Sequence, residues 1–212
     1  LGSPNKQTRL TWLNSTMAQE NIVVAPYTPL TINDKVISLL GRNFEINGDG
    51  FPKQIQTFFN SEMTGYTEKP NNILYEPIHF HFYNTPKTQE KFTASNFQIT
   101  SKEAGTIKWA ATNTSSNLKM DVEGALEFDG YVHYVVKVTA LNDVDFSNVD
   151  FHIPFDKGAT KYLMGLGEKG GVRPDTVSWK WDVAHKNQDA VWIGNVNAGL
   201  YYNLRDEHYV RP

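Results

Sequence analysis

Two histidines that could hold a metal ion, His79 and His81, stand two positions apart in a run of alternating aromatic residues. In a β-strand this spacing turns both imidazoles to one face, and Phe80 and Phe82 to the opposite, core-facing side. A metal site would need a third and a fourth ligand from elsewhere in the chain. The simpler interpretation is a polar pair that faces solvent or a partner, so no metal ligand is predicted.

Two carboxylates that could act as an acid pair, Asp121 and Glu123, lie on one face of a predicted strand. Glycoside hydrolysis uses such a pair, and a strand spaces alternate residues by ~7 Å. An exposed strand face, however, offers no burial that would raise the pKa of the acid. We therefore predict no catalytic residue in this chain.

A glycine-rich run, MGLGEKGG at residues 164–171, has four glycines in eight positions. Nucleotide-binding loops need a helix directly after the glycines, and the following VRPD cannot start one in register. The run is predicted to be a structural loop with positive φ angles, and no cofactor is expected.

Aromatic residues gather near the C-terminus, where three of the five tryptophans fall within fourteen residues. Exposed aromatic rings can stack on sugars, and they can also fill a contact with another domain or belong to an ordinary core. These three alternatives stay open on the sequence alone. The residues predicted to contact carbohydrate or a neighbouring domain are Trp179, Trp181, Trp192, Arg173 and Glu168.

The composition excludes several functional classes for these 212 residues. The absence of cysteine removes thiol nucleophiles, disulfides and thiolate metal sites. A net charge of −3 without a basic block argues against binding to nucleic acid. No window approaches 18 uninterrupted apolar residues, so no membrane-spanning segment is expected.

Alternating apolar residues and frequent turn residues predict an all-β fold, an antiparallel β-sandwich with less than about 15% helix. The expected strands are 36–40, 43–46, 52–59, 78–83, 97–101, 105–113, 118–127, 131–140 and 149–155. Residues 1–30 are predicted to be an irregular lead-in, 60–76 a long surface loop, and 161–212 a Gly/Trp-rich extension of one domain that spans 1–212. Within the extension, residues 164–200 are expected to form an extended excursion from the sandwich.

The strongest local prediction is a hairpin over residues 118–140, turned by Asp129 and Gly130. One face of its first strand carries Met120, Val122, Gly124, Leu126 and Phe128, and this face is predicted to be core. Tyr131, Val135 and Val138 are expected to be among its neighbours in the core.

Several ordered motifs carry a resemblance to a known family. They are RLTWLNST (9–16), VAPYTPL (24–30), FPKQIQ (51–56), MGLGEKGGVRP (164–174), WKWD (179–182) and VWIGNVNAGL (191–200). Together they resemble the N-terminal domain of large glycosidase-like proteins of gut Bacteroidota that are related to glycoside hydrolase family 123.

The resemblance implies a β-sandwich that precedes a (β/α)₈ catalytic barrel in an exported, periplasmic or cell-surface enzyme of polysaccharide degradation. In that family the barrel cleaves N-acetyl-β-galactosaminides with assistance from the substrate's acetamido group, and it contains the catalytic acids. The chain is thus expected to be a fragment whose partner is the downstream barrel. Two functions remain open: a non-catalytic accessory domain that packs on the barrel, or an autonomous carbohydrate-binding module.

Overall fold

The computed structural model describes residues 21–85, 88–180 and 190–204. Strands make up 58% of the structure and helix 2%, which confirms the predicted all-β class. The described part contains one short 3₁₀-helix, Lys157–Ala159, whose first turn is capped by the Asp156 carboxylate. Four antiparallel sheets account for the remaining regular structure.

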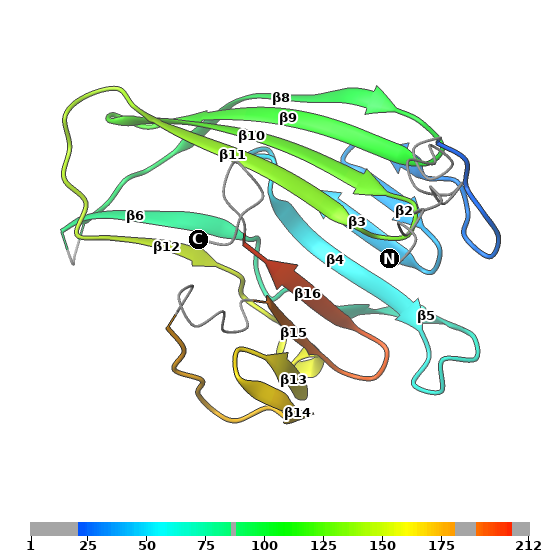
Figure 1. Cartoon of the computed structure of the whole chain (residues 1–212). Helices are drawn as coiled ribbons and strands as arrows, with labels where there is room; N and C mark the ends of the chain where they lie inside the picture. Colours follow the sequence, from blue (N-terminus) through cyan, green and yellow to red (C-terminus); the bar gives the residue numbers. More distant parts are fainter. Residues whose placement is uncertain (1–20, 86–87, 181–189, 205–212) are drawn as a thin grey trace, which may run out of the picture.

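The upper layer in Figure 1 is a sheet of four long strands in the order β11–β10–β9–β8. Its strands are β8 (Thr93–Lys102), β9 (Thr106–Thr114), β10 (Leu118–Glu127) and β11 (Val132–Ala140). The predicted hairpin between β10 and β11 is confirmed, with Leu126 paired to Val132. Gly130 adopts a φ of 95° in the connecting turn, a conformation that favours glycine.

The opposite layer is made of two sheets that lie under the upper sheet (Figure 1). One has the order β1–β2–β3–β4–β5, and the other has the order β12–β6–β7. The first comprises β1 (Thr31–Asn33), β2 (Val36–Leu39), β3 (Arg42–Ile46), β4 (Pro52–Phe59) and β5 (Tyr66–Asn72). The second comprises β6 (His79–Thr85), β7 (Thr88–Gln89) and β12 (Asn148–His152).

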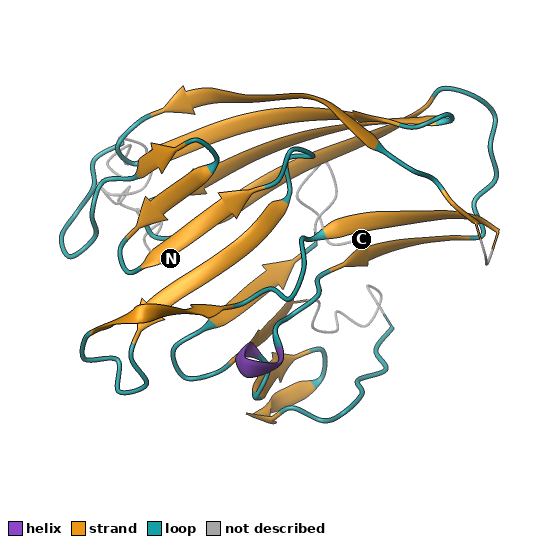
Figure 2. Cartoon of the chain, turned by 180° about the vertical axis from the view of Figure 1, so that it is seen from behind, coloured by secondary structure: helices purple, strands orange, loops and turns teal. Residues whose placement is uncertain are grey.

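A smaller sheet, which we call the C-terminal sheet, has the order β14–β13–β15–β16. It consists of β13 (Tyr162–Gly165), β14 (Glu168–Val172), β15 (Ala190–Gly194) and β16 (Gly199–Asn203). Figure 2 shows it beside the 3₁₀-helix, below the two main layers. Two hydrogen bonds tie its β15–β16 turn to β4: Thr57 Oγ1 donates to the Asn197 carbonyl at 2.6 Å, and Asn197 Nδ2 donates to the Phe59 carbonyl at 2.8 Å.

The core lies between the layers and has two parts. Near β2 and β3, the indole of Trp109 packs with Phe44, Ile37 and Leu126. Near β6, β12 and the C-terminal sheet, the second part contains Phe51, Ile73, Leu74, Ile78, Phe82, Met120, Val122 and Ala198. The predicted core face of β10 is therefore confirmed for Met120, Val122 and Leu126.

The three predicted core neighbours are wrong. Tyr131 is 58% exposed and Val135 is 49% exposed. Val135 is paired with the exposed Glu123, so both side chains project from the outer face of the sheet. Val138 is paired with the buried Met120, yet it too stays largely exposed near the end of β11.

Two predictions about irregular segments are also wrong. Residues 60–76 include β5, which pairs with β4, so they are not a continuous loop. This strand is mostly polar because it lies at the edge of its sheet, where no alternation is imposed and Pro70 is tolerated. Residues 164–200 are not an extended excursion, because their described parts supply most of the paired C-terminal sheet.

Candidate functional site

An exposed apolar surface covers the outer face of the C-terminal sheet. Met164, Trp192 and Tyr201 form one rung across three strands, because Trp192 is paired with both of the others. Tyr162 and Val172 form a second pair on the same face. Met164 is 51% exposed and Tyr201 is 61% exposed. We call these five residues the outer face.

Trp192 is held on this face by two glycines that follow it, Gly194 on its own strand β15 and Gly199 on β16. A Cβ atom at Gly194 would overlap its indole ring, and one at Gly199 would lie 2.9 Å from its Cζ2 atom. Gly194 and Gly199 are directly paired, so together they leave a floor without side chains under the ring. The half-buried Trp192 can therefore lie close to the sheet and keep part of its surface exposed.

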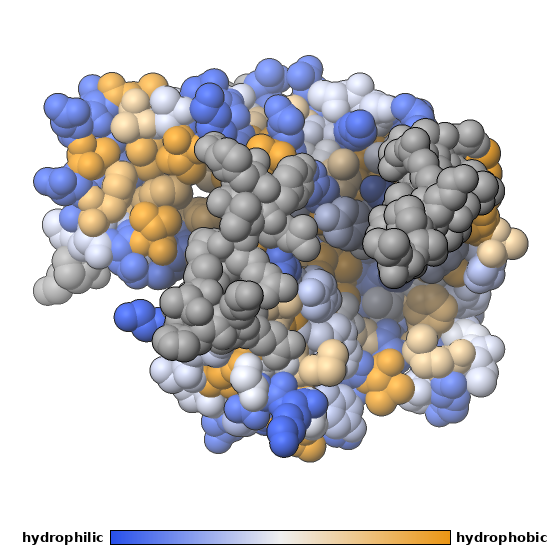
Figure 3. All heavy atoms as spheres, viewed as in Figure 1, coloured by the Kyte–Doolittle hydropathy of each residue, from blue (hydrophilic) through white to orange (hydrophobic). Residues whose placement is uncertain are grey.

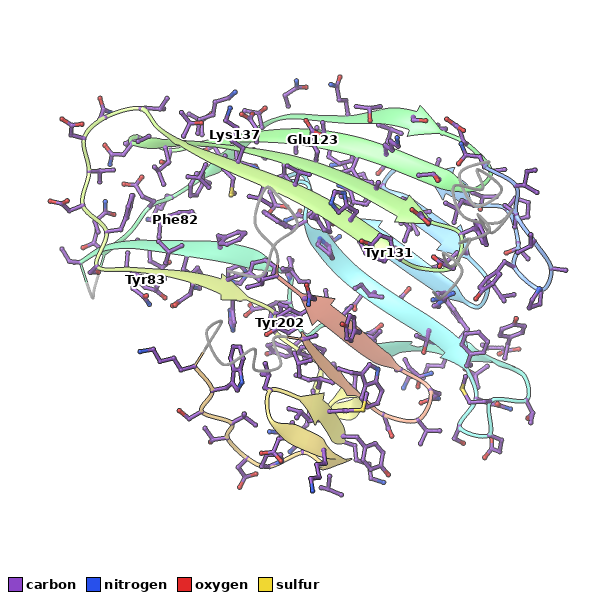
Figure 4. All side chains as sticks on the ribbon, in the orientation of Figure 1. Phe82, Tyr83, Glu123, Tyr131, Lys137 and Tyr202 are labelled. Carbon is purple, nitrogen blue, oxygen red and sulfur yellow. The ribbon has the colours of Figure 1, made fainter. Side chains whose placement is uncertain are left out.

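The opposite face of the C-terminal sheet explains why these residues point outward. Leu163 and Val191 are buried on that face, and Leu200 packs against the core. Tyr202 lies on the same inner side, and Figure 4 shows it on β16 near the centre of the molecule. Burial raises the pKa of the Tyr202 phenol, so the phenol stays protonated. Because side chains alternate along each strand, burying this set turns Trp192 and Tyr201 outward.

Arg173, predicted to contact sugar or another domain, is engaged within the chain. Its Nε donates to the Thr160 carbonyl at 3.0 Å, and its Nη1 donates to the Pro174 carbonyl at 2.8 Å. Its backbone N–H also donates to the carbonyl of Lys161 at 2.9 Å. Arg173 therefore fastens the segment after β14 to the start of β13, and β13 separates it from Trp192.

The other predicted site residues lie in different places. Glu168 begins β14 and is exposed, paired with Gly165 beside the tight turn between β13 and β14. Trp179 is half-buried in the irregular segment that follows β14. Trp181 lies outside the described residues. Sequence reasoning missed Tyr162 and Met164, although their alternation with the buried Leu163 is the signal that places them outward.

Figure 3 shows hydrophobic residues on the lower part of the surface, where the C-terminal sheet lies, interspersed with polar ones. An apolar surface bordered by polar groups is typical of contacts with another protein domain or a ligand. Aromatic residues are enriched in such contacts, because they bury a large area with few rotatable bonds.

The outer side of the upper sheet holds the predicted carboxylates. A shallow hollow of about 350 Å³ is lined there by Thr112, Asp121, Glu123, Val135 and Lys137, among others, and Figure 4 labels Glu123 and Lys137 on this side. The hydrogen bond from Lys119, at 2.8 Å, lowers the pKa of Asp121, and the Thr112 hydroxyl adds to the effect. An acid that ionises so readily is a poor proton donor at neutral pH.

Three histidines gather on the outer side of β6 and β12. His79 and His81 are joined there by His152, and their ligating nitrogens all lie within 4.8 Å of one another. Figure 4 shows Phe82 between β6 and the upper sheet, and Tyr83 on the other side of β6. Sequence reasoning missed His152 because it follows His79 by 73 positions and only strand pairing unites them.

Within the described residues, no helix is long and apolar enough to cross a membrane. A comparison with protein families finds a match over residues 30–212 to the family described as glycoside hydrolase 123, third domain. Comparisons with curated proteins and with solved structures gave no match. The family description counts a third domain, whereas the sequence resemblance implies an N-terminal one. The position of this domain in a longer chain therefore stays a prediction.

Proposed function

The chain belongs to the family of glycoside hydrolase 123 third domains, and from this premise we propose that it is a non-catalytic accessory domain of such an enzyme. In this proposal the outer face of the C-terminal sheet packs against the catalytic domain of the same polypeptide. As the sequence resemblance implies, that domain is a (β/α)₈ barrel that acts on N-acetyl-β-galactosaminides in an exported enzyme.

The observation that carries the proposal is the rung formed by Met164, Trp192 and Tyr201. Three large apolar side chains in register on a small sheet are more than the sheet needs for its own packing, since its inner face already supplies Leu163, Val191 and Leu200 to the interior. An aromatic side chain buries about 150–250 Å² in a full contact. At about 25 cal/mol per Å², covering two such rings contributes several kcal/mol before ordering costs.

Two carboxylates support a non-catalytic role. The pKa of Asp121 is lowered by its hydrogen bond from Lys119, which opposes use as a general acid. Burial raises the pKa of Asp49, but its oxygens accept hydrogen bonds from the Phe51 N–H and from Asn47 Nδ2 inside the β3–β4 turn. Asp49 therefore shapes a turn, and its proton is not presented to a substrate.

A second candidate function is carbohydrate binding by the same outer face. The observation that favours it is the glycine floor, because an indole held flat against a sheet presents one ring surface for stacking on the apolar face of a sugar. Tyr201, directly paired with Trp192, adds a second exposed ring and a hydroxyl group that can hydrogen-bond.

The decisive experiment compares protection of the outer face in two polypeptides: the present chain, and a longer one that includes the adjoining catalytic domain. Hydroxyl-radical footprinting read by mass spectrometry reports oxidation of Met164, Trp192 and Tyr201 separately. We expect strong oxidation of all three in the present chain and strong protection in the longer polypeptide. Tyr131, exposed at the far β10–β11 turn, is the matched control and should react equally in both.

Equal oxidation of the outer face in both polypeptides contradicts domain packing. In that event, titration of the present chain with oligosaccharides that contain N-acetyl-β-galactosamine, followed by tryptophan fluorescence, tests the second function. Sugar binding that is lost in Trp192→Ala and kept in Val135→Ala assigns the face to carbohydrate. The absence of binding removes that function as well.

A further inference from the structure

The outer side of β6 and β12 carries a row of metal-binding side chains that the proposed function does not use. Strand pairing sets His79 opposite His152, and His81 opposite Asp150. Directly paired residues of antiparallel strands project to the same face, so the three imidazoles and the carboxylate lie together. The alternating residues Phe80 and Phe151 stack on the core side, with ring centroids 4.6 Å apart. Packing of the phenylalanines thus fixes the face on which the histidines stand.

The spacing of the nitrogens suits one small cation. His152 Nδ1 and His79 Nε2 are 3.3 Å apart. Two nitrogens bound to a tetrahedral Zn²⁺ at ~2.0–2.1 Å lie about 3.3 Å from each other. The ring of His81 lies 4.4 Å from that of His79 and 5.7 Å from that of His152, measured between centroids. The ligating nitrogens of all three rings therefore surround one point on the surface.

The hydrogen-bond partners of His79 and His81 leave one nitrogen of each ring for a metal, and His152 offers its Nδ1 once its proton moves to Nε2. His79 Nδ1 is 2.7 Å from the Pro77 carbonyl oxygen, which can only accept, so Nδ1 carries the proton and Nε2 keeps its lone pair. His81 Nδ1 is 3.1 Å from the Tyr83 hydroxyl oxygen, which can accept a hydrogen bond from Nδ1–H and leave Nε2 as the ligand. Metal-binding histidines almost always make such an outer hydrogen bond to a carbonyl or another oxygen.

The charges around the cluster favour a cation. Asp150 is the direct strand partner of His81, so its carboxylate lies on the same face as the three imidazoles. Asp150 is also fixed in place by a 2.7 Å hydrogen bond from Asn148 Nδ2. His79 and His81 are half-buried and His152 is exposed, so a metal ion can enter from solvent.

From this geometry we propose that His79, His81 and His152 bind a divalent transition-metal ion, with Zn²⁺ as the metal that the donor set fits best. The ion replaces the contact between His79 and His152 and cross-links β12 to β6. Three histidines leave the fourth position of zinc to water or to an added donor. Because β12 is held mainly by its pairing with β6, the cross-link stabilises this end of the sandwich.

The test uses the full chain without an oligohistidine tag, treated with EDTA and then titrated with Zn²⁺ by calorimetry. We expect one Zn²⁺ per chain and a rise in the unfolding midpoint when Zn²⁺ is present, as follows when a ligand binds only the folded state. Mg²⁺ should give neither effect, because it prefers oxygen ligands. Co²⁺ should give the visible absorption of a nitrogen-bound ion in place of the spectrum of free Co²⁺.

Variants then assign the site. Loss of a residue that hydrogen-bonds a metal ligand usually weakens metal binding ~10–100-fold, and Tyr83→Phe should fall within that range. His152→Ala removes a ligand itself and should weaken Zn²⁺ binding by more. His133→Ala, on β11, is the matched control and should bind as the unchanged chain does. In the unchanged chain, nitrogen NMR should show a shift of His79 Nε2 on addition of Zn²⁺, a readout that needs no variant.

Three results would overturn the proposal. The first is the absence of stoichiometric Zn²⁺ binding by the unchanged chain. The second is binding that His152→Ala retains in full. The third is binding without any change at the nitrogens of His79 and His81. None of these results depends on the outer face, so the metal site and the proposed accessory role can each be contradicted without affecting the other.

Discussion

Trp109 in the upper sheet and Trp192 in the C-terminal sheet use the same packing arrangement with opposite results. Each indole lies over glycine, and a Cβ atom at Gly124 or at Gly194 would overlap the ring. Gly124 is the direct strand partner of Trp109, whereas Gly194 lies two residues after Trp192 on the same strand. Trp109 is 1% exposed, and its Nε1 donates to the Gly50 carbonyl at 2.8 Å. Trp192 is only half-buried on the outer face.

The difference shows that the nearby glycines decide where each indole lies, while the side chains on the other side of the indole decide whether it is buried. Around Trp109, the opposing sheet supplies Phe44 at a centroid distance of 5.8 Å, and β11 of its own sheet supplies Tyr134 at 5.7 Å. The outer side of Trp192 has beside it Met164 and Tyr201, which are themselves exposed. The first tryptophan thus completes a core, and the second leaves a surface that a neighbouring domain or a sugar can complete.

The largest expected effect comes from truncating Trp109, the buried tryptophan of the two. Trp109→Ala should lower the free energy of unfolding by about 3–5 kcal/mol, because it opens a large cavity and leaves the Gly50 carbonyl without its indole donor. Chemical denaturation followed by circular dichroism measures the change. A loss below about 1 kcal/mol would show that the two layers do not depend on this indole.

The glycines under the two rings give a matched pair of smaller effects. Gly124→Ala should cost about 1–3 kcal/mol, because the enclosed Trp109 cannot move away without strain. Gly199→Ala should cost less, because Trp192 can swing toward solvent. Denaturation curves give the two stabilities, and the emission maximum of tryptophan should move to longer wavelength in Gly199→Ala. Equal costs would contradict the contrast drawn between the two rings.

Truncating Trp192, the more exposed of the two tryptophans, should affect stability still less. Trp192→Ala is expected to lower the free energy of unfolding by less than about 1.5 kcal/mol, since a half-buried side chain contributes only part of the free energy of full burial. The same variant should weaken contact with the adjoining catalytic domain. Val135→Ala, an exposed apolar residue on the opposite side of the molecule, serves as the control for both measurements. A loss of several kcal/mol would make Trp192 a core residue.

The smallest expected effect concerns the β3–β4 turn, in which the Gly50 carbonyl accepts the hydrogen bond from Trp109. Burial raises the pKa of Asp49, although hydrogen bonds from Phe51 and Asn47 partly oppose it. A carboxyl group with a raised pKa in the folded state stabilises the fold below its ordinary pKa, and this contribution is lost as pH rises through the raised value. Asp49→Asn should therefore flatten the fall in stability over that interval. An unchanged pH profile would show that the carboxyl is equally ionised in both states.

Most of the main sandwich could be predicted from the sequence, because alternation and turn residues act locally. The β10–β11 hairpin follows from Asp129 and Gly130, and the core positions Met120, Val122 and Leu126 follow from a period of two. The outward position of Val135 has a signal in the sequence, because the polar residues His133 and Lys137 share its face of the strand, and the pairing with Glu123 agrees with it. The polar edge strand β5 could not be predicted, because neither of its faces is buried and no alternation results.

The candidate sites were predicted only in part, because both depend on pairing between distant segments. The tryptophan cluster includes Trp192, but the set of Met164, Trp192 and Tyr201 forms only once β13, β15 and β16 are in register. Arg173 has the residue type of a binding group, yet its guanidinium is occupied by the carbonyls of Thr160 and Pro174. His152 offered no local signal at all.

The two hydrogen bonds between β4 and Asn197 also set an order of events during synthesis. Their partners, Thr57 and Phe59, leave the ribosome 140 and 138 residues before Asn197. At ~5–20 residues per second, that interval lasts roughly 7–28 seconds. Local hairpins form within microseconds, so β4 is by then paired on both sides, with β3 and with β5. The Thr57 hydroxyl and the Phe59 carbonyl nevertheless lack their partner Asn197 until the C-terminal sheet arrives. The nascent chain therefore passes through a period in which the surface of β4 that contacts this sheet is exposed, and the period ends only when the sheet docks.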